Sequence, residues 1–411
     1  MAVAVLLLIS HTRLHVFVPG AEVLRPALLV GVVTLALWVV QKNPLRSLRC
    51  FKDPVSRPAI FIAIWAVATV PFAVWPAGTA TSILDRLLTT VLVFMMAVAA
   101  VRSLEDVRRL MGVFALGVGL YAILAPAGGE VRGMSAGGYD PNDAAMFLVS
   151  GFPVLVFFLL FGRRPLFRIL AGAGAFAFLV GLVDTGSRGG FLAFAAVLAF
   201  MVTMLRGISP AFRAAVVAVT FLGMVPLATA EYWERIETIT ELEDGYGADD
   251  DLRGRWAVWG RGVGYWAQNP VSGVGMDNFT FMEGRHPAIQ ARLAEGRGIP
   301  FRAPHSQWVQ VLAELGVVGF IAYVLVFVRS FRNLRGLQVG RGALPPQWRT
   351  RETRVMAGVL MASLLAVAVG GSFLSNSYNM ATWGIWALIV ALLKVLHFQR
   401  ASSNGTHGSG P

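Results

Sequence analysis

Long apolar runs recur from one end of this sequence to the other, and they constrain its fold more than any other feature. Residues 83–101 and 143–161 are two examples, each close to the length that spans a bilayer. An α-helix of about 20 apolar residues crosses the roughly 30 Å hydrocarbon core of a membrane. The runs are continuous rather than alternating, which excludes a transmembrane β-barrel. The sequence therefore predicts an all-α, polytopic membrane protein.

About twelve transmembrane helices are expected from the length and spacing of these runs. The first is the weakest, because His11, Arg13 and His15 interrupt it, and we expect it to be short, broken or partly interfacial. The expected spans cover residues 2–18, 24–41, 58–75, 83–101, 107–124, 143–161, 167–183, 189–205, 212–228, 307–328, 355–371 and 378–397.

Basic residues indicate how the chain is oriented. They concentrate in every second connection between spans, at residues 42–57, 102–109, 163–168, 206–213 and 329–354. An excess of Lys and Arg is typical of cytoplasmic loops. The alternation keeps one phase throughout, which predicts that both termini are cytoplasmic. It also accounts for the net charge of +12 without nucleic-acid binding.

The expected organisation has four parts. Residues 1–228 form transmembrane helices 1–9, residues 229–306 form a long outer loop, residues 307–397 form helices 10–12, and residues 398–411 form a disordered tail. The outer loop is too long for a simple connection, so we expect a helical cap over the bundle. Cys50 is the only cysteine, so neither an intrachain disulfide nor a cysteine metal cluster is possible.

One amphipathic helix is expected within this cap, over residues 252–267. Trp256, Trp259, Val263 and Trp266 recur at helical spacing. We interpret this stripe as a packing or interfacial anchoring surface in preference to a platform for sugars. Arg255 shares a helical face with Trp259, and the alternative to a functional role is a charged, solvated face.

A second candidate is the short connection Asp184-Thr-Gly-Ser187-Arg188-Gly189-Gly190, which joins two expected spans on the outer face. Arg188 must lie at the membrane edge, near a helix start. Helix N-termini favour anions, and a guanidinium matches the geometry of phosphate. A snorkelling arginine with no chemical role is the alternative.

The third candidate lies where the polar loop enters an apolar span, at Arg302-Ala-Pro-His305-Ser306. The ordinary pKa of histidine suits proton transfer near neutrality. Ser306 is better explained as the helix N-cap.

Further along, Glu314 is expected on the opposite face of the same helix, paired with a polar group. Gly316 and Gly319 are expected to permit a close helix crossing.

Two other polar segments are better explained without chemistry. Asp140-Pro141-Asn142-Asp143 has the pattern of a helix start, which favours capping over a contribution to the outer site. The run at residues 249–251 consists of three aspartates and is expected to be a solvated acidic loop, although carboxylates can also bind a divalent cation.

Taken in order, the motifs resemble those of the O-antigen ligase and polymerase superfamily, bacterial envelope glycosyltransferases similar in fold to the GT-C class. His305 and Ser306 are followed by nine residues, Gly316, two residues and Gly319, which matches the family's outer-loop pattern completely. The other matching positions are Ser187-Arg188-Gly189, Arg255-Trp256, Pro270, Gly273, Gly275 and Asn142-Asp143.

The resemblance implies transfer of a glycan from undecaprenyl diphosphate to an acceptor hydroxyl on the periplasmic face of the bacterial inner membrane. It implies that His305 is the base and that Arg188 and Arg255 hold the diphosphate without a metal or a cofactor. The other residues expected to contact substrate are Arg302, Ser187, Ser306, Arg132 and His286, the last also being the reserve candidate for the base.

The motifs are compatible with three kinds of acceptor. Lipid A-core makes the protein an O-antigen ligase, which we favour; a second glycan makes it a polymerase; and a protein serine makes it an O-oligosaccharyltransferase. A transporter of lipid-linked sugar is the competing class. Transporters place polar groups near mid-membrane within paired, interrupted halves, whereas the polar candidates here gather on one face.

Overall fold

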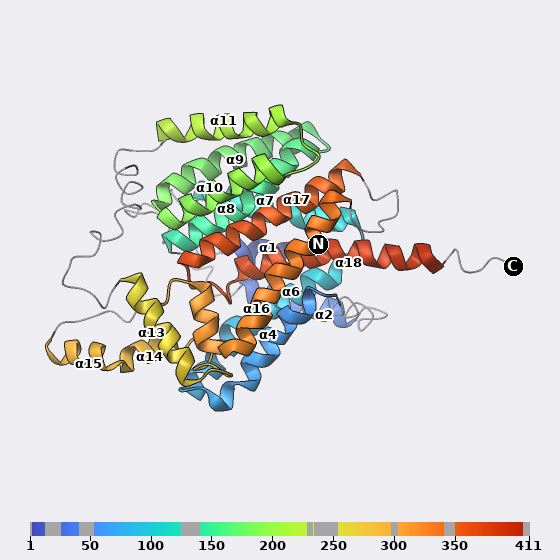
Figure 1. The fold of residues 1–411 in the computed structure, drawn as a ribbon. Coiled ribbons are helices and arrows are strands. Elements are labelled where there is room, and N and C mark those ends of the chain that lie inside the picture. The colour runs from blue at the N-terminus through green and yellow to red at the C-terminus, as the bar shows by residue number, and fades with distance from the viewer. Residues whose placement is uncertain are drawn as a thin grey trace.

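The computed structural model describes residues 2–12, 26–40, 53–124, 140–227, 233, 254–296, 303–340 and 350–405, and all the regular structure in these ranges is helical (Figure 1). The helices of the N-terminal half are α1 (Ala2–Thr12), α2 (Pro26–Val39), α4 (Ser56–Ala68), η4 (Val70–Phe72), α5 (Pro76–Ser82), η5 (Ile83–Leu87), α6 (Leu88–Ala100), α7 (Leu104–Leu124) and α8 (Pro141–Phe161). Those that follow are α9 (Pro165–Thr185), α10 (Arg188–Met204), α11 (Pro210–Leu227), α13 (Arg255–Gln268), α14 (Phe279–Arg285), α15 (Pro287–Ala294), α16 (Gln307–Val339), α17 (Arg351–Gly370), η9 (Gly371–Phe373) and α18 (Met380–Gly405).

The all-α, multi-pass membrane character expected from the sequence is confirmed. Six helical stretches in the described residues are long and apolar enough to cross a membrane: Pro76–Ala100, α7, α8, α9, α16 and Arg351–Phe373. Shorter apolar helices occur at α1, α2, α4, α10, α11 and α18. Each expected span overlaps one of these helices, and the total of twelve crossings stays a prediction. Helix α18 continues to Gly405, so residues 398–405 are helical and not part of the expected tail.

Helix α8 is the centre of one half of the bundle. It packs against α7, α9, α10 and α17 (Figure 1), and every residue from Ala144 to Phe157 is buried. A helix that is apolar on all sides belongs inside a protein. Gly151 lets α7 approach closely, because a β-carbon there would lie 2.2 Å from a methyl of Val118.

The second half of the bundle contains α1, α4, α6, α16 and α18. One lysine ties two of these helices together. Lys394 of α18 donates hydrogen bonds from Nζ to the carbonyl oxygens of Val98, Ala99 and Val101, at 2.8, 3.2 and 2.8 Å. These carbonyls lie at the end of α6 and have no helical partner of their own.

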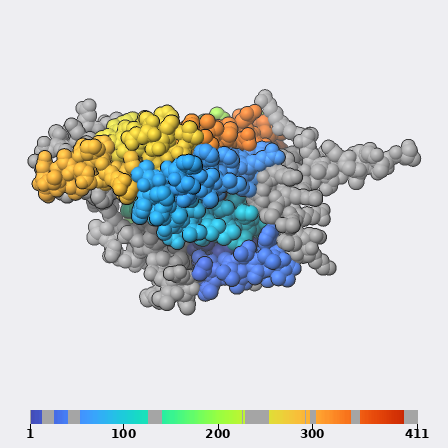
Figure 2. Space-filling model, turned by 90° about the horizontal axis from the view of Figure 1, so that it is seen from below, coloured from blue at the N-terminus to red at the C-terminus, as the bar shows by residue number. Residues whose placement is uncertain are grey.

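Helices α13, α14 and α15 lie together at the end of the bundle where α8 and α16 begin (Figure 1). Seen from below, they lie beside the blue surface of the segment that contains α4 and α5 (Figure 2). A small apolar core of Val258, Tyr265, Val274, Phe279 and Ala313 joins α13 and α14 to α16. The expected cap helix at 252–267 is therefore present as α13. Its placement on the periplasmic side stays a prediction.

The buried face of α13 is not the tryptophan stripe. Trp256 is 72% exposed and Val263 is 45% exposed, whereas Val258, Gly262 and Tyr265 are buried. Of the two roles expected for the stripe, packing against the protein does not apply to these two residues, and interfacial anchoring stays a prediction. The glycine decides the orientation, since a β-carbon at position 262 would lie 2.5 Å from the side chain of Val309 in α16.

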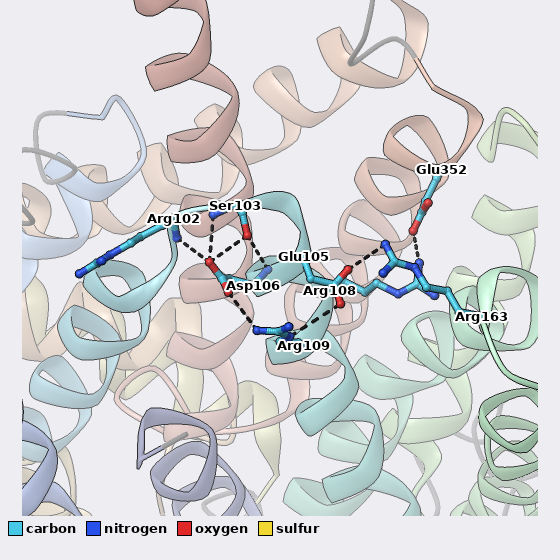
Figure 3. A network of polar contacts seen from close by, with 8 residues as sticks. All are labelled: Arg102, Ser103, Glu105, Asp106, Arg108, Arg109, Arg163 and Glu352. Carbon is cyan, nitrogen blue, oxygen red and sulfur yellow. Dashed lines mark hydrogen bonds and ion pairs between the residues drawn. The ribbon is translucent and has the colours of Figure 1, made fainter.

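The opposite end of the bundle carries a network of charged side chains (Figure 3). Buried Arg108 of α7 forms an ion pair with Glu352 of α17 and donates to the carbonyl oxygen of Phe161. Glu105 forms an ion pair with Arg163 at 2.8 Å. The network joins the starts of α7 and α17 to the end of α8. Its members are Arg102, Ser103, Glu105, Asp106, Arg108, Arg109, Arg163 and Glu352.

Candidate functional site

Helix α16 is broken at Gly316, two residues past Glu314, and the break shapes the site. Gly316 has φ 65° and ψ −171°, a conformation open to glycine and strained for other residues. A β-carbon there would lie 2.2 Å from the carbonyl oxygen of Val271. The glycine therefore admits the backbone of a neighbouring loop, and not a second helix as the sequence led us to expect. Gly319 does allow close contact with α4, through Trp65.

The loop at residues 270–275 takes over the hydrogen bonds that the break removes from α16. Val274 N–H donates to Ala313 O and Gly275 N–H to Glu314 O, both at 2.9 Å. In return, Val317 N–H donates to Pro270 O at 2.9 Å. Backbone groups buried in an apolar bundle need such partners. The Pro270-x-x-Gly273-x-Gly275 pattern is thus the part of the outer loop that is inserted beside α16.

His305 lies immediately before the start of α16. Ser306 is the N-cap, as expected, and its Oγ accepts from Val309 N–H at 3.5 Å. His305 itself has a left-handed backbone, with φ 45°. Its N–H donates to Ser375 Oγ at 2.8 Å. On the other side, the indole Nε1 of Trp259 donates to the carbonyl oxygen of Pro304 at 2.8 Å. His305 is therefore held between α13 and the segment that precedes α18.

Arg255 and the Ser187-Arg188-Gly189 motif both approach Phe373 in η9. The guanidinium carbon of Arg255 lies 5.5 Å from the centre of the Phe373 ring. A β-carbon placed on Gly189 would lie 3.0 Å from Cβ of Phe373. Because Ser375, two residues further on, binds His305, the three motifs meet at residues 373–375. Sequence analysis had predicted the three motifs but not the segment that gathers them.

Ser187 caps the helix that carries Arg188. Its Oγ accepts from Gly190 N–H at 3.0 Å and donates to Asn142 Oδ1 at 2.7 Å. Asp140 caps α8 in the same way, as expected, by accepting from the N–H groups of Asn142 and Asp143 at 2.7 and 2.9 Å. The starts of α8 and α10 are therefore joined, and both contribute to this end of the bundle.

His286 lies elsewhere in the cap. Its ring centre is 6.4 Å from that of Tyr265, and both residues line a pocket of about 440 Å³ together with Arg261. Arg261 forms a buried ion pair with Glu283 at 2.6 Å, which raises the pKa of the guanidinium. Burial and the nearby Glu283 raise the pKa of Tyr265. These contacts hold α13 on α14.

The remaining predicted residues cannot be placed. Arg302 and Arg132 lie outside the described residues, as does the acidic run at residues 249–251.

A cavity of about 1130 Å³ opens beside His305, and sequence analysis missed most of the polar groups in it. Pro304, which precedes His305, and Ser375, which accepts a hydrogen bond from the His305 N–H, both line it. Glu314 also lines it. The sequence signal for this site is the polar run 375–379 between two apolar segments. The polar side chains of the cavity are Ser10, Asp85, Arg86, Thr89, Thr90, Asp143, Asp277, Thr280, Gln310, Glu314, Ser375, Asn376, Tyr378 and Asn379.

Asp277 and Tyr378 are two polar residues at the wall of this cavity. Asp277 accepts from Ser82 Oγ at 2.8 Å and pairs with Arg86 at 3.2 Å. Tyr378 is buried beside the Glu314 carboxyl group. Its phenolic hydroxyl can donate or accept a hydrogen bond.

Residues 173–324 match the family model described as O-antigen ligase. The matched segment runs from α9 to the part of α16 beyond Gly319, so it contains Arg188, Arg255 and His305. No curated protein matches the chain.

Proposed function

Because this chain belongs to the O-antigen ligase and polymerase superfamily, we propose that it transfers a glycan from undecaprenyl diphosphate to an acceptor hydroxyl at the periplasmic end of its bundle. The observation that carries the proposal is the meeting of three motifs at residues 373–375. Arg255 and the motif of Arg188 approach Phe373, and His305 is bound by Ser375.

In the proposed reaction, the acceptor oxygen attacks the anomeric carbon of the donor glycan. The bond between that carbon and the phosphate oxygen breaks, and undecaprenyl diphosphate leaves with its electron pair. His305 takes the proton from the acceptor hydroxyl. Arg188 and Arg255 bind the leaving diphosphate, where guanidinium groups stabilise the charge that develops.

Three features support these roles. Arg188 is at the first turn of α10, where the helix dipole adds to its positive charge. Arg255 occupies the same position in α13. His305 is held by its backbone on both sides, as a base that must keep one orientation requires.

We favour lipid A-core as the acceptor, which makes the protein an O-antigen ligase. The alternative is a polymerase that extends a second lipid-linked glycan with the same groups. Transfer to a protein serine and transport of the lipid-linked donor are less favoured.

The test is a transfer assay with the full-length protein in lipid nanodiscs. Undecaprenyl-diphosphate glycan is supplied with lipid A-core, in the presence of EDTA, to the wild type and to His305→Ala. We expect transfer to lipid A-core by the wild type and a loss of about a hundredfold or more in the variant. His286→Ala is assayed in parallel; a comparable loss there, with His305→Ala active, contradicts the assignment of the base.

The same assay separates the alternatives. Extension of the donor glycan without use of lipid A-core identifies a polymerase. Movement of the donor across a vesicle bilayer with neither reaction identifies a transporter and overturns the proposed function.

A further inference from the structure

Arg213 of α11 has one buried guanidinium nitrogen that lacks a partner. Its Nη1 donates at 2.6 Å to the carbonyl oxygen of Val202, near the end of α10, where carbonyls have no helical partner. Its Nε is buried and makes no hydrogen bond within the described residues. Native proteins rarely leave such groups unsatisfied, and a guanidinium can only donate. The missing partner is therefore an acceptor, and an anion is the strongest one.

Two further arginines lie at the connection between α10 and α11. Arg206 is exposed within it. Arg351 of α17 donates from Nε to the carbonyl oxygen of Gly207 at 2.6 Å, so its guanidinium lies beside the same connection. The sequence has no Asp or Glu from residue 188 to residue 227. Glu352, which follows Arg351, already forms an ion pair within the network of Figure 3. This end of the two helices therefore attracts an anion.

An apolar crevice runs between α10 and α11 from the same arginine. Met201 of α10 and Val216 of α11 both line it, and every lining residue among those described, except Arg213, is apolar. Helix α11 lies at the outer edge of the bundle (Figure 1), and Val219 and Leu222 are 67% and 71% exposed on it. The crevice therefore lies beside a surface that faces lipid.

The length of the apolar part of α11 fits one leaflet of a bilayer. Residues 214–223 follow Arg213 and contain no charged side chain. Ten helical residues rise about 15 Å, which is half of the roughly 30 Å hydrocarbon core. Arg213 thus lies at the depth of the lipid phosphates when these residues span a leaflet. A free anion would satisfy the guanidinium alone, whereas a phospholipid also covers the apolar crevice.

We propose that an anionic phospholipid binds between α10 and α11, with its phosphate at Arg213, Arg206 and Arg351 and one acyl chain along the crevice. Basic pockets between transmembrane helices bind such headgroups. The lipid would fasten α11, which packs on α9 and α10, to the bundle. Arg188 begins α10, a helix of 17 residues and so about 25 Å long, and the lipid site lies beyond its other end. The proposal is therefore independent of the proposed reaction.

The experiment measures lipid binding by native mass spectrometry of the full-length protein. Phosphatidylglycerol and phosphatidylcholine with the same acyl chains are titrated separately into delipidated protein in detergent. Both headgroups contain a phosphate, but only phosphatidylglycerol has a net negative charge. We expect the wild type to bind phosphatidylglycerol about tenfold more tightly, because several cations act on that charge.

Three variants complete the test. Arg213→Gln should weaken the binding of phosphatidylglycerol about fivefold, the effect of one cation near a membrane surface. Arg206→Gln changes an exposed side chain, should have a similar effect, and serves if Arg213→Gln fails to fold. Arg57→Gln is the matched control, because Arg57 is an exposed arginine at the start of α4, which packs against α16. It removes the same charge and should leave both affinities unchanged.

Equal affinity of the wild type for the two lipids overturns the proposal. So does a loss of affinity in Arg57→Gln as large as that in folded Arg213→Gln or Arg206→Gln, because bulk charge then explains the binding. Glycerol 3-phosphate is added as a competitor without acyl chains. Displacement of phosphatidylglycerol at equal concentration identifies a site for small anions and also overturns the proposal. No outcome depends on glycan transfer, so failure here leaves the proposed function as it stands.

Discussion

The indole Nε1 of Trp259 and the carbonyl oxygen of Pro304 are joined by a hydrogen bond of 2.8 Å, across 45 positions of sequence. This bond fixes α13, which begins with Arg255, to the residue before His305. The position of the proposed base therefore depends on a helix that also carries one of the proposed phosphate ligands. Trp259 is therefore a positioning residue for His305.

Trp259→Phe should lower the rate of transfer about tenfold while the protein remains folded, because the ring is kept and one hydrogen bond of about 1 kcal/mol is lost. Turnover and KM are measured with purified protein. Trp266→Phe is the matched control, since its indole donates at 3.1 Å to the carbonyl oxygen of Pro270, an exposed residue. Equal effects of the two substitutions would show that Trp259 contributes only to folding.

Gly316→Ala should destabilise the protein strongly. The alanine β-carbon would lie 2.2 Å from the carbonyl oxygen of Val271, and the alanine backbone would have to adopt a positive φ. We expect a loss of more than about 3 kcal/mol, measured as thermal unfolding in detergent. Gly340→Ala has a φ of 72° with nothing within 4 Å, and it should cost only the roughly 1 kcal/mol of the left-handed conformation. A similar melting temperature for the two variants contradicts this account.

Arg188→Lys and Arg255→Lys should each reduce transfer about tenfold to a hundredfold, because an ammonium cannot bind phosphate with two parallel hydrogen bonds. Turnover should fall more than the affinity for the donor, since charge develops on the leaving group in the transition state. Arg285→Lys is the control, because its guanidinium lies over Phe281, 4.4 Å from the ring centre. Full activity of both lysine variants argues against diphosphate binding by these residues.

Stability should fall as the pH rises above about 10, the ordinary tyrosine value. Burial raises the pKa of Tyr265 in the folded state, so an unfolded chain releases this proton at a pH where the native protein retains it. The native state then binds more protons, and alkali favours unfolding. Tyr265→Phe should make the decline above about pH 10 shallower. Parallel slopes in chemical unfolding of the two proteins would contradict the prediction.

Local rules of helix formation explain how much of the fold could be foreseen. Apolar runs predicted the positions of α7, α8, α9 and α17, and cap residues predicted where α8 and α16 begin. Asp140 and Ser306 act within three residues of their own positions, so no distant contact is needed to recognise them. The helix at residues 252–267 was found from its periodicity for the same reason.

The break in α16 was not foreseen, because its cause lies elsewhere in the chain. A glycine inside an apolar run is compatible with an unbroken helix or a helix crossing. Only the loop at Val271 and Gly273, more than forty residues earlier, selects the extended conformation at Gly316. The buried face of α13 could not be predicted for the same reason, since close contact with Val309 of another helix requires that Gly262 face inward.

The sequence by itself determined the all-α membrane architecture, the helix caps and the motifs that carry Arg188, Arg255 and His305, because each depends on composition or on neighbours within a few positions. Tertiary structure alone decided that these motifs meet at Phe373 and Ser375, and that Glu314 shares a cavity with Pro304 and Tyr378. These relationships join segments separated by tens to hundreds of residues, and packing between helices, not local preference, sets such distances.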